Sequence, residues 1–495
     1  MYACSFKRQN IFKIMQRKNW TRKVISLAAG HNELKQNLKT RHVTMISIGG
    51  VIGAGLFVGS GAIIDSTGPG AIFSYIIAGL MIVLIMRMLG EMAVVNPDSG
   101  SFSTYAHNAM GPWAGFTIGW LYWFNWVIIV AIEATLLGGM VHDWFPSIPV
   151  WAASVVFPLL MLVTNIFSVK AYGEFEYWLA LIKVTAIVIF LCLGAAILFG
   201  LVPGIKAQSF SDITANGGFF PKGILPVFLS VIFITFSLSG SEVAAIAAGE
   251  SENPHKNIMK AINAVVWRLL LFFVGSVAVL IMVIPQDAKD MLLTPYASVF
   301  ELAGFSAAGQ VMNFVIFISL LSVLNSGLYT SSRMVYSLAT KGDAPKILAR
   351  VNKRGVPIWA LVISLIFAYV FTMFKFIAPN TIFVFLANSS GGVTMVMYIF
   401  IAFSHIILRR RMEKKDPGQL KVKMWLFPYL TYATIIGLFA IFVAQAFIES
   451  MRLQFLLSSL LTVLVIGTYF LFYRKKEQPA LAVEELQLNE TVINK

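Results

Sequence analysis

Charged residues are scarce in this chain. Asp, Glu, Lys and Arg make up only 12% of its 495 residues, about half the share of roughly 25% that soluble domains carry. Hydrophobic residues make up 58%, more than a soluble core can hide. Long polar stretches that could form a kinase, ATPase or nucleic-acid-binding domain are also missing. These absences argue against a receptor kinase, an ABC transporter and an ATP-driven pump.

Cysteine and clusters of metal ligands are scarce as well. Only Cys4 and Cys192 occur, so there is no disulfide framework, and Cys192 lies inside an apolar segment, where a buried thiol packs as a small hydrophobe. His, Cys and carboxylate residues nowhere cluster at metal-binding spacing. We therefore expect no metal, no cofactor and no enzymatic activity.

Long apolar runs dominate what is present. A membrane-spanning helix needs ~20 apolar residues, and windows of about nineteen residues place twelve segments, at 43–64, 71–95, 112–140, 148–168, 177–200, 224–248, 262–284, 306–336, 357–377, 381–408, 425–449 and 453–473. The sequence thus predicts an all-α membrane protein with twelve transmembrane helices. Residues 1–42 form a basic tail, 43–473 the transmembrane domain, and 474–495 a C-terminal tail.

The basic residues predict the orientation, because loops rich in Lys and Arg stay cytoplasmic. Of the 38 Lys and Arg residues, 32 fall on one side of the twelve segments and five on the other, while Lys183 lies within a segment. Both termini are therefore expected in the cytoplasm of a cell whose plasma membrane the chain crosses many times. The net charge of +15 marks the inner face of a bilayer rather than a nucleic-acid site.

Two segments are interrupted by small residues. The first contains the run from Gly49 to Gly55, and the sixth contains Ser239, Gly240 and Ser241. Close helix packing through small residues is the simpler explanation of either run. The two occupy equivalent positions, however, if 43–200 and 224–408 are two five-helix repeats and 425–473 adds two helices. Paired interruptions of this kind indicate an inverted-repeat transporter with its site at the breaks.

Such breaks suit a zwitterion. Unwinding a helix frees N–H groups at one half-helix and carbonyls at the other, and N–H groups at a helix start bind anions. We expect the substrate carboxylate at the amides of Gly53, Ala54 and Gly55. The ammonium group is expected at the carbonyls of Val51, Phe236 and Ser239, beside Gly240. A sugar or a metal ion would call for different side chains.

Ionisable residues at membrane depth are costly and therefore candidates for function. Glu242 follows the second break and could change protonation during transport, or serve only as a hydrogen-bond anchor. Burial penalises a charged ammonium, so Lys183 could gain and lose a proton, or simply extend to the interface. Glu133 could meet a substrate amine or a buried Arg. Arg87 and Glu91, four residues apart, are predicted to pair within their helix and shape a cytoplasmic gate.

Several uncharged residues are also candidates. Ser322, Asn325 and Asn388 lie in the eighth and tenth segments, where polar groups are expected to face the protein interior. They could contact substrate or bond neighbouring helices. In the aromatic run from Trp120 to Trp126, most rings are expected at the membrane interface, and one could wall the cavity.

These segments resemble bacterial amino-acid permeases of the amino acid-polyamine-organocation superfamily. The resemblance rests on the run 38–57, on Gly90-Glu91-Met92, on 99–103 and 111–115, and on Ala247-Ala248-Gly249-Glu250 and Asn325-Ser326-Gly327-Leu328-Tyr329. It extends over about residues 32–475. Within the family, 388–391 and 423–428 look most like the gamma-aminobutyrate permeases.

The resemblance implies a LeuT-type fold, a 5+5 inverted repeat with broken helices 1 and 6 plus two extra helices. It also implies uptake driven by protons. The substrate carboxylate would meet Ala54 and Gly55, and its amine the carbonyls of the two breaks. Lys183 would occupy the place that a sodium ion takes in sodium-driven relatives.

We therefore predict a proton symporter that imports a small zwitterionic amino acid by alternating access, with gamma-aminobutyrate as the favoured substrate. Two positions near the expected pocket depart from the gamma-aminobutyrate permease pattern: Ser239 stands where that pattern has Met, and Val323 where it has Cys. A permease or exchanger for alanine, serine, glycine or histidine therefore stays an alternative. A non-transporting amino-acid sensor is a further one.

Overall fold

The computed structural model describes residues 39–243, 258, 260, 262 and 269–474, apart from residues 97, 99, 168, 204, 206, 216, 286, 287, 378–381 and 421. Within these residues every regular element is a helix, which confirms the predicted all-α class. Residues 1–38 and 475–495 of the predicted tails lie outside this part of the chain. So do residues 244–248 of the sixth predicted segment and most of 262–268 of the seventh.

The helices of the first half follow the predicted segments. In chain order they are α2 (Thr40–Gly49), α3 (Ala54–Phe57), α4 (Gly59–Thr67), α5 (Ala71–Val95), α6 (Ser101–Met110), α7 (Pro112–Trp144), α8 (Val150–Phe167), α9 (Val169–Leu198) and α10 (Phe210–Thr214). The first predicted segment is broken, because residues 50–53 between α2 and α3 are not helical. The second, 71–95, coincides with α5. Helix α7 begins with Pro112, a residue favoured at the first helical position.

The second half contains a further set of helices. They are α11 (Leu225–Ser237), α14 (Gly275–Val283), α15 (Pro295–Leu302), α16 (Ser306–Lys341), α17 (Ile358–Ile377), α18 (Ile382–Lys415), α19 (Tyr429–Ala444) and α20 (Glu449–Thr468). Helix α11 ends at Ser237, well before the end of the predicted segment 224–248, and residues 238–242 are not helical. The sixth segment is therefore interrupted as well. The short helices α6, α10 and α15 lie outside the twelve predicted segments. The expected burial of Cys192 is wrong, because this residue of α9 is exposed.

Many of these helices are suited to a bilayer, where a helix satisfies its own backbone hydrogen bonds. By length and composition, eight stretches of the described chain could cross a membrane: Ala54–Val95, Pro112–Trp144, Val150–Phe167, Ala171–Leu198, Ser306–Lys341, Phe383–Lys415, Tyr429–Phe447 and Glu449–Tyr473. The first of them holds both the C-terminal part of predicted segment one, from residue 54, and all of segment two. Three shorter apolar helices lie in the sixth, seventh and ninth predicted segments: Leu225–Ser237, Leu271–Val283 and Ile358–Met373. The chain is a multi-pass membrane protein.

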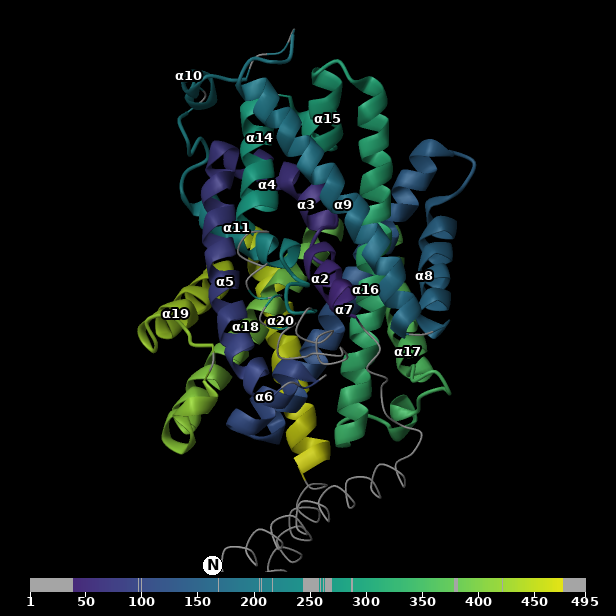
Figure 1. The fold of residues 1–495 in the computed structure, drawn as a ribbon, viewed down its shortest axis with the longest axis vertical. Coiled ribbons are helices and arrows are strands. Elements are labelled where there is room, and N and C mark those ends of the chain that lie inside the picture. Colours follow the sequence, from purple (N-terminus) through teal and green to yellow (C-terminus); the bar gives the residue numbers. More distant parts are fainter. Residues whose placement is uncertain are drawn as a thin grey trace, which may run out of the picture.

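The broken first segment runs through the middle of the helices. Figure 1 shows α2, α3 and α4 following one another near the centre of the view. Helix α2 packs against α9, and α11 packs against α18. The long helices α7 and α16 pack against each other, and each also contacts its chain neighbour, α8 or α17. Both breaks are therefore enclosed by helices from distant parts of the sequence.

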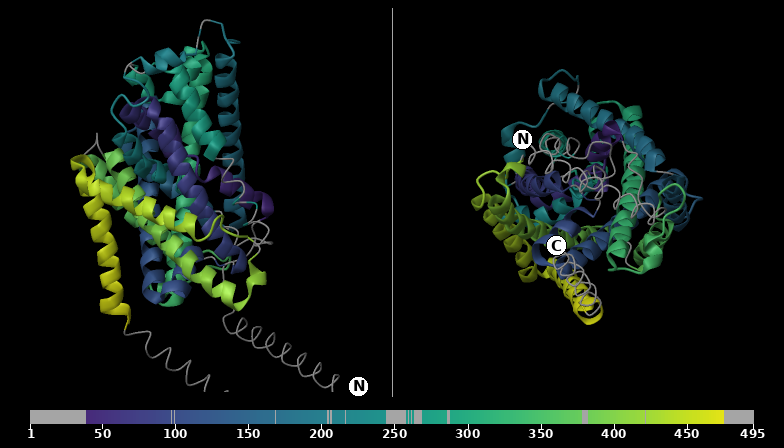
Figure 2. Two further views of the ribbon diagram at one scale, coloured as in Figure 1. Left: turned by 90° about the vertical axis from the view of Figure 1, so that its left-hand side faces the viewer. Right: turned by 60° about the horizontal axis from the view of Figure 1, so that its bottom comes forward.

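The last two helices lie on the outside of this arrangement. Helix α19 packs against α18 and α5, and α20 against α18 and α7. Figure 2 shows α20, in yellow, along the edge of the molecule. Its Leu453, Leu460 and Val463 side chains are exposed, as expected of a helix that faces lipid.

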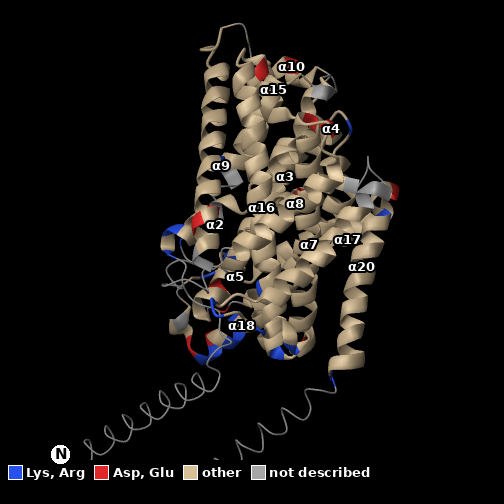
Figure 3. Cartoon of the chain, turned by 90° about the vertical axis from the view of Figure 1, so that its right-hand side faces the viewer, with Lys and Arg blue, Asp and Glu red and all other residues tan. Residues whose placement is uncertain are grey.

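Charged residues are distributed unevenly along the molecule. Figure 3 shows Lys and Arg gathered toward the end that carries the C-terminal part of α18. That part contains Arg409, Arg410, Arg411, Lys414 and Lys415. Most of the ribbon between the two ends carries neither colour in this view, although charged residues also lie beside α2. A largely uncharged stretch of this kind is what a bilayer requires.

Candidate substrate and coupling site

The two helix breaks touch each other. The first break is formed by residues 50–53, which separate α2 from α3. The second is formed by residues 238–242, which follow α11 and are not helical. Gly240 has φ of +105°, a conformation that side chains other than glycine rarely adopt. A Cβ atom on Gly240 would lie 2.6 Å from the carbonyl oxygen of Gly50. The two interruptions are thus in direct backbone contact.

Gly55 brings the start of α3 against the end of α11. A Cβ atom on Gly55 would lie 2.4 Å from Cα of Ser237, closer than any side chain could stand. The side of Gly55 that a side chain would occupy therefore faces the backbone of α11. Glycine at this position sets the distance between the two broken segments.

A carboxylate already lies at the amides where a substrate carboxylate was predicted. The N–H of Ala54 donates to Oε1 of Glu133 at 3.4 Å, and Oε1 is 3.0 Å from the position of a Cβ on Gly53. The first N–H groups of a helix lack partners within it, so they are free to meet an anion. Glu133 is 2% exposed. Its Oε2 has no hydrogen-bond partner in the described part of the chain.

The predicted ammonium site is lined by backbone and hydroxyl oxygens. Val51 and Phe236 are buried, and the carbonyl of Phe236 accepts from the N–H of Ser239 at 3.0 Å. A carbonyl has a second lone pair for another donor. The Ser239 hydroxyl donates to the carbonyl of Thr235 at 3.2 Å and lies 3.3 Å from Oγ1 of Thr394. Thr394, on α18, is a site candidate that the sequence did not reveal.

Lys183 ties the first break to α16. Its side chain is fully buried, and its Nζ donates to the carbonyl of Gly49, to the carbonyl of Ile52 at 3.1 Å and to the hydroxyl of Ser322 at 2.8 Å. These carbonyls lie where α2 ends, and that of Gly49 also accepts from the N–H of Ile52 at 3.2 Å. The lysine does not extend to the interface, and instead it holds the break from the side of α9.

Glu242 closes the second break. The N–H of Gly240 donates to both carboxylate oxygens, each at 3.2 Å, and the hydroxyl of Tyr398 donates to Oε2 at 3.5 Å. The side chain is 2% exposed. This geometry matches the hydrogen-bond anchor that the sequence left open for Glu242. A part in coupling stays a prediction.

The polar residues of α16 bond to neighbouring helices. The hydroxyl of Ser322 donates to Glu176 on α9, and Nδ2 of Asn325 donates to the other oxygen of Glu176 at 3.5 Å. Asn165 of α8 donates to Oδ1 of Asn325 at 2.7 Å. Glu176 was not predicted from the sequence, although its spacing of seven residues from Lys183 places both on one helix face.

In α18, Asn388 is buried and its Oδ1 has no partner among the described residues. The nearby Ser390 donates to Oδ1 of Asn125 on α7 at 2.5 Å. The tenth segment therefore bonds α7 through Ser390. Asn388 is still a candidate for substrate contact.

The predicted pair of Arg87 and Glu91 is wrong. Nε of Arg87 donates to the carbonyl of Lys423 at 3.1 Å. Glu91 accepts from Nη1 of Arg409 at 2.6 Å and from the N–H of Met424 at 2.7 Å. The loop between α18 and α19 crosses the end of α5 and provides partners that the spacing within α5 could not reveal.

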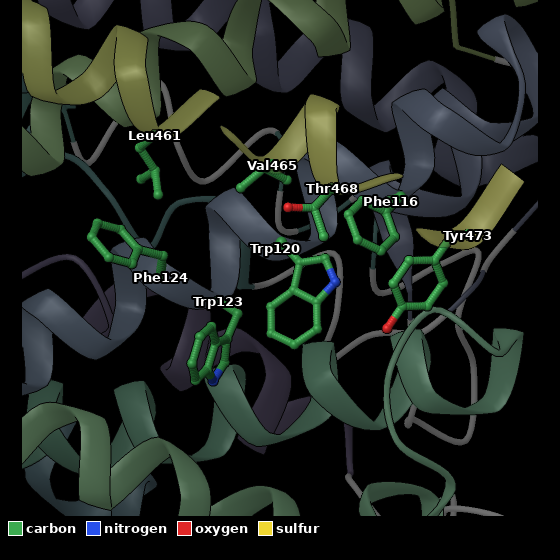
Figure 4. A pocket seen from close by; sticks show the side chains of 8 residues that line it. All are labelled: Phe116, Trp120, Trp123, Phe124, Leu461, Val465, Thr468 and Tyr473. Atoms are coloured by element: carbon green, nitrogen blue, oxygen red, sulfur yellow. The ribbon is translucent and has the colours of Figure 1, made fainter. Parts of the chain in front are cut away.

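The aromatic run on α7 divides between two surroundings. Trp126 is fully buried, and its Cη2 lies 3.6 Å from the position of a Cβ on Gly240. Trp120 and Trp123 instead line a groove of about 270 Å³ between α7 and α20, together with Phe116, Phe124, Leu461, Val465, Thr468 and Tyr473 (Figure 4). Trp126 is therefore a ring of this run that walls the second break.

Comparisons with known proteins identify the family. Residues 42–481 match the family model described as amino acid permease. A gamma-aminobutyric acid permease of Bacillus subtilis (strain 168) is 51% identical over 90% of this chain and 94% of its own length. A gamma-aminobutyric acid permease of Escherichia coli (strain K12) is 41% identical over 90% and 96%. A crystal structure of a mutant manganese transporter from Eremococcus coleocola superposes with a TM-score of 0.56, at 14% identity, over 86% of this chain and 92% of that one. The last likeness concerns the fold alone.

Proposed function

This chain belongs to the amino acid permease family, and from that premise we propose that it imports gamma-aminobutyrate by proton symport with alternating access. The family match bears out the resemblance drawn from the sequence, so amino-acid transport is the function. Two relatives whose names specify gamma-aminobutyric acid align with nearly their whole length, which favours that substrate. The observation that carries the proposal is the contact between the two broken helices at Gly50 and Gly240.

The proposed architecture has twelve spans, with a 5+5 inverted repeat and two extra helices. Its support is a packing pattern that occurs twice. Helix α2 packs on α9 as α11 packs on α18, and α7 packs on α8 as α16 packs on α17. Helix α7 also contacts α18 as α16 contacts α9. In each pair the helices hold the same positions within the two proposed repeats, 43–200 and 224–408.

The proposed binding site spans both breaks. The substrate carboxylate is held by the amides of Gly53, Ala54 and Gly55, at the positive end of the half-helix that α3 begins. Its ammonium donates to the carbonyls of Val51, Phe236 and Ser239, beside Gly240. Glu133 must move away or take up a proton when the substrate carboxylate arrives, because two negative charges cannot share the Ala54 amide.

The proposed coupling group is Lys183. Its three hydrogen bonds join α9, the end of α2 and α16. A protonated Nζ can donate all three, while a neutral amine has one donor fewer and a lone pair. Loss of the proton therefore loosens the first break from α16. This gives proton binding a mechanical effect on the helices that hold the substrate.

The proposed location is the cell membrane, with both termini in the cytoplasm. The gathering of Lys and Arg at one end of the molecule supports this orientation, since basic loops are retained on the cytoplasmic side.

Uptake in cells that lack other amino-acid permeases tests the function. We expect saturable accumulation of labelled gamma-aminobutyrate that an uncoupler abolishes and that sodium replacement leaves unchanged. Competition by unlabelled alanine, serine, glycine and histidine ranks the alternative substrates. Stronger competition by any of these than by gamma-aminobutyrate would reject the favoured substrate. An absence of uptake with intact binding would point to a sensor.

Replacing Lys183 tests the coupling. Lys183→Met preserves the length of the side chain but cannot carry a proton, so it should eliminate accumulation while the protein stays in the membrane. Lys222→Met is the matched control, because Lys222 lies outside the helices and donates to the carbonyl of Asp65 at 2.6 Å. Full accumulation by the Lys183→Met variant would reject the coupling role.

A further inference from the structure

A second buried carboxylate lies on the same face of α9 as Lys183. Glu176 is fully buried and precedes Lys183 by seven residues, which is about two helical turns or ~10 Å along the axis. In the proposed orientation α9 starts at the cytoplasmic side, so Glu176 lies between Lys183 and the cytoplasm. A buried carboxylate within a membrane helix is costly and marks a functional position unless it is paired.

A single hydroxyl connects the two groups. Nζ of Lys183 donates to Oγ of Ser322 at 2.8 Å, and the same Oγ donates to Oε1 of Glu176. A serine hydroxyl has one proton to give and lone pairs to accept, so both bonds exist at once. Both hydrogen bonds therefore run in one direction, with Lys183 donating to Ser322 and Ser322 donating to Glu176.

The remaining partners of Glu176 are neutral. Nδ2 of Asn325 reaches Oε2 at 3.5 Å, and Asn325 itself is held by Asn165 and Thr164 of α8. This arrangement fixes the carboxylate in place without supplying a counter-charge. The amide of Asn325 can bond the carboxylate whether or not it carries a proton.

The other titratable groups nearby lie at either end of this connection. Glu133 of α7 is hydrogen-bonded to the first break, on the substrate side of Lys183. Toward the cytoplasm, Tyr172 of α9 bonds the hydroxyl of Ser326 and stacks on Tyr329 of α16. Arg333 of α16 lies over the ring of Tyr329, 4.2 Å from its centroid.

We infer that Glu176 accepts the proton of Lys183 through the Ser322 hydroxyl and passes it toward the cytoplasm. In the step, Nζ gives a proton to Oγ of Ser322 while Oγ gives its own proton to Oε1 of Glu176. An ammonium and a carboxylate become an amine and a carboxylic acid, and the serine is unchanged. Glu176 then releases the proton to water. The inference rests on the proposed coupling role of Lys183.

The exit from Glu176 is short. Glu174, two residues earlier on α9, has a side chain that is 33% exposed and forms an ion pair with Arg41. A partly exposed carboxylate thus lies within one helical turn of Glu176, at the N-terminal part of α9 that the proposed orientation places toward the cytoplasm. This supports the cytoplasm as the destination of the proton.

Transport by the full chain in lipid vesicles tests the relay. Glu176→Gln preserves an acceptor for Ser322 but cannot take up a proton. We expect accumulation driven by a proton gradient to fall at least about tenfold, as for loss of an acid–base group, while counterflow of labelled against unlabelled gamma-aminobutyrate continues. Ser322→Ala should behave in the same way, and Ser322→Thr, which keeps a hydroxyl, should restore accumulation.

Glu174→Gln is the matched control, as a carboxylate on the same helix outside the connection, and should accumulate normally. Infrared spectroscopy provides a second readout: on alkalinisation, a protonated-carboxyl signal should disappear in the Glu174→Gln variant and be missing throughout in Glu176→Gln. Normal accumulation by Glu176→Gln, or equal loss of accumulation and counterflow, would overturn the relay. If Glu176→Gln fails to fold, equal accumulation by Ser322→Ala and Ser322→Thr would overturn it. Accumulation by Lys183→Met would instead reject the coupling role on which the inference rests.

Discussion

At the scale of single residues, the distance between the two broken helices depends on a missing side chain. Gly55→Ala would place a Cβ atom 2.4 Å from the Ser237 backbone, and backbone cannot turn aside as a flexible side chain can. Overpacking of this kind costs ~1–3 kcal/mol. We expect Gly55→Ala to lower the thermal unfolding midpoint in detergent and to abolish uptake.

Gly139 provides the control for this substitution. It lies in α7, and a Cβ atom there would have nothing within 4 Å. Because alanine is the better helix former by up to ~1 kcal/mol, Gly139→Ala should leave uptake unchanged and the midpoint equal or higher. Wild-type uptake by Gly55→Ala would contradict the packing of α3 against α11.

The residues that the sequence predicted are those with a local signature. The run of glycines indicates a helix break whatever it packs against. A single lysine within an apolar segment, such as Lys183, can likewise be recognised from the local sequence alone. Glu176 lacks that signature, because a carboxylate near the end of a span reads as interfacial. Its burial comes from α8 and α16, whose positions the local sequence does not specify. The local sequence likewise does not specify which side of α7 faces the breaks, so it could not show that Trp126 is the residue beside them.

At the scale of elements, the loop between α18 and α19 is fixed to the end of α5 by Glu91. Removing this carboxylate leaves Arg409 without its partner at 2.6 Å and the N–H of Met424 without its acceptor. Breaking a buried ion pair costs ~3–5 kcal/mol. Glu91→Ala should therefore strongly lower the unfolding midpoint and expose this loop to added protease.

The control for this prediction is the other carboxylate bonded to Arg409. Glu413 pairs with Nε at 2.8 Å, but its side chain is 42% exposed, and exposed pairs contribute at most ~1 kcal/mol. Glu413→Ala should be close to wild type in both measurements. Equal effects of the two substitutions would show that the loop is not held through Glu91.

Element boundaries were predictable where hydropathy alone decides them, as for 71–95 and α5. Element partners were not. The spacing of Arg87 and Glu91 predicted a pair within α5, and both residues bond a loop more than 300 positions later in the chain. A pattern along one helix cannot account for a loop that crosses its end.

At the scale of the whole molecule, the proposed orientation rests on the distribution of Lys and Arg. Single cysteines introduced at Lys222 and Lys346, in a chain with Cys4→Ser and Cys192→Ala, report the two sides. A membrane-impermeant thiol reagent should label Lys222→Cys in intact cells and Lys346→Cys only after permeabilisation. The reverse pattern would show that the orientation is opposite to the proposed one. Labelling of both cysteines in intact cells would reject the placement of the two positions on opposite sides of the membrane.

Lys183 belongs covalently to α9, so in the proposed mechanism the amine that binds the driving proton stays within the protein. Only a proton crosses with each zwitterion, and this sets an energetic ceiling. A membrane potential of 100 mV supplies about 2.3 kcal/mol per charge, enough to concentrate the substrate about 50-fold at ~1.4 kcal/mol per tenfold. The salt of the surroundings adds nothing to this ratio. In the proposed mechanism, accumulation of the substrate is therefore independent of the external salt concentration, and it is lost when both the pH gradient and the membrane potential are removed.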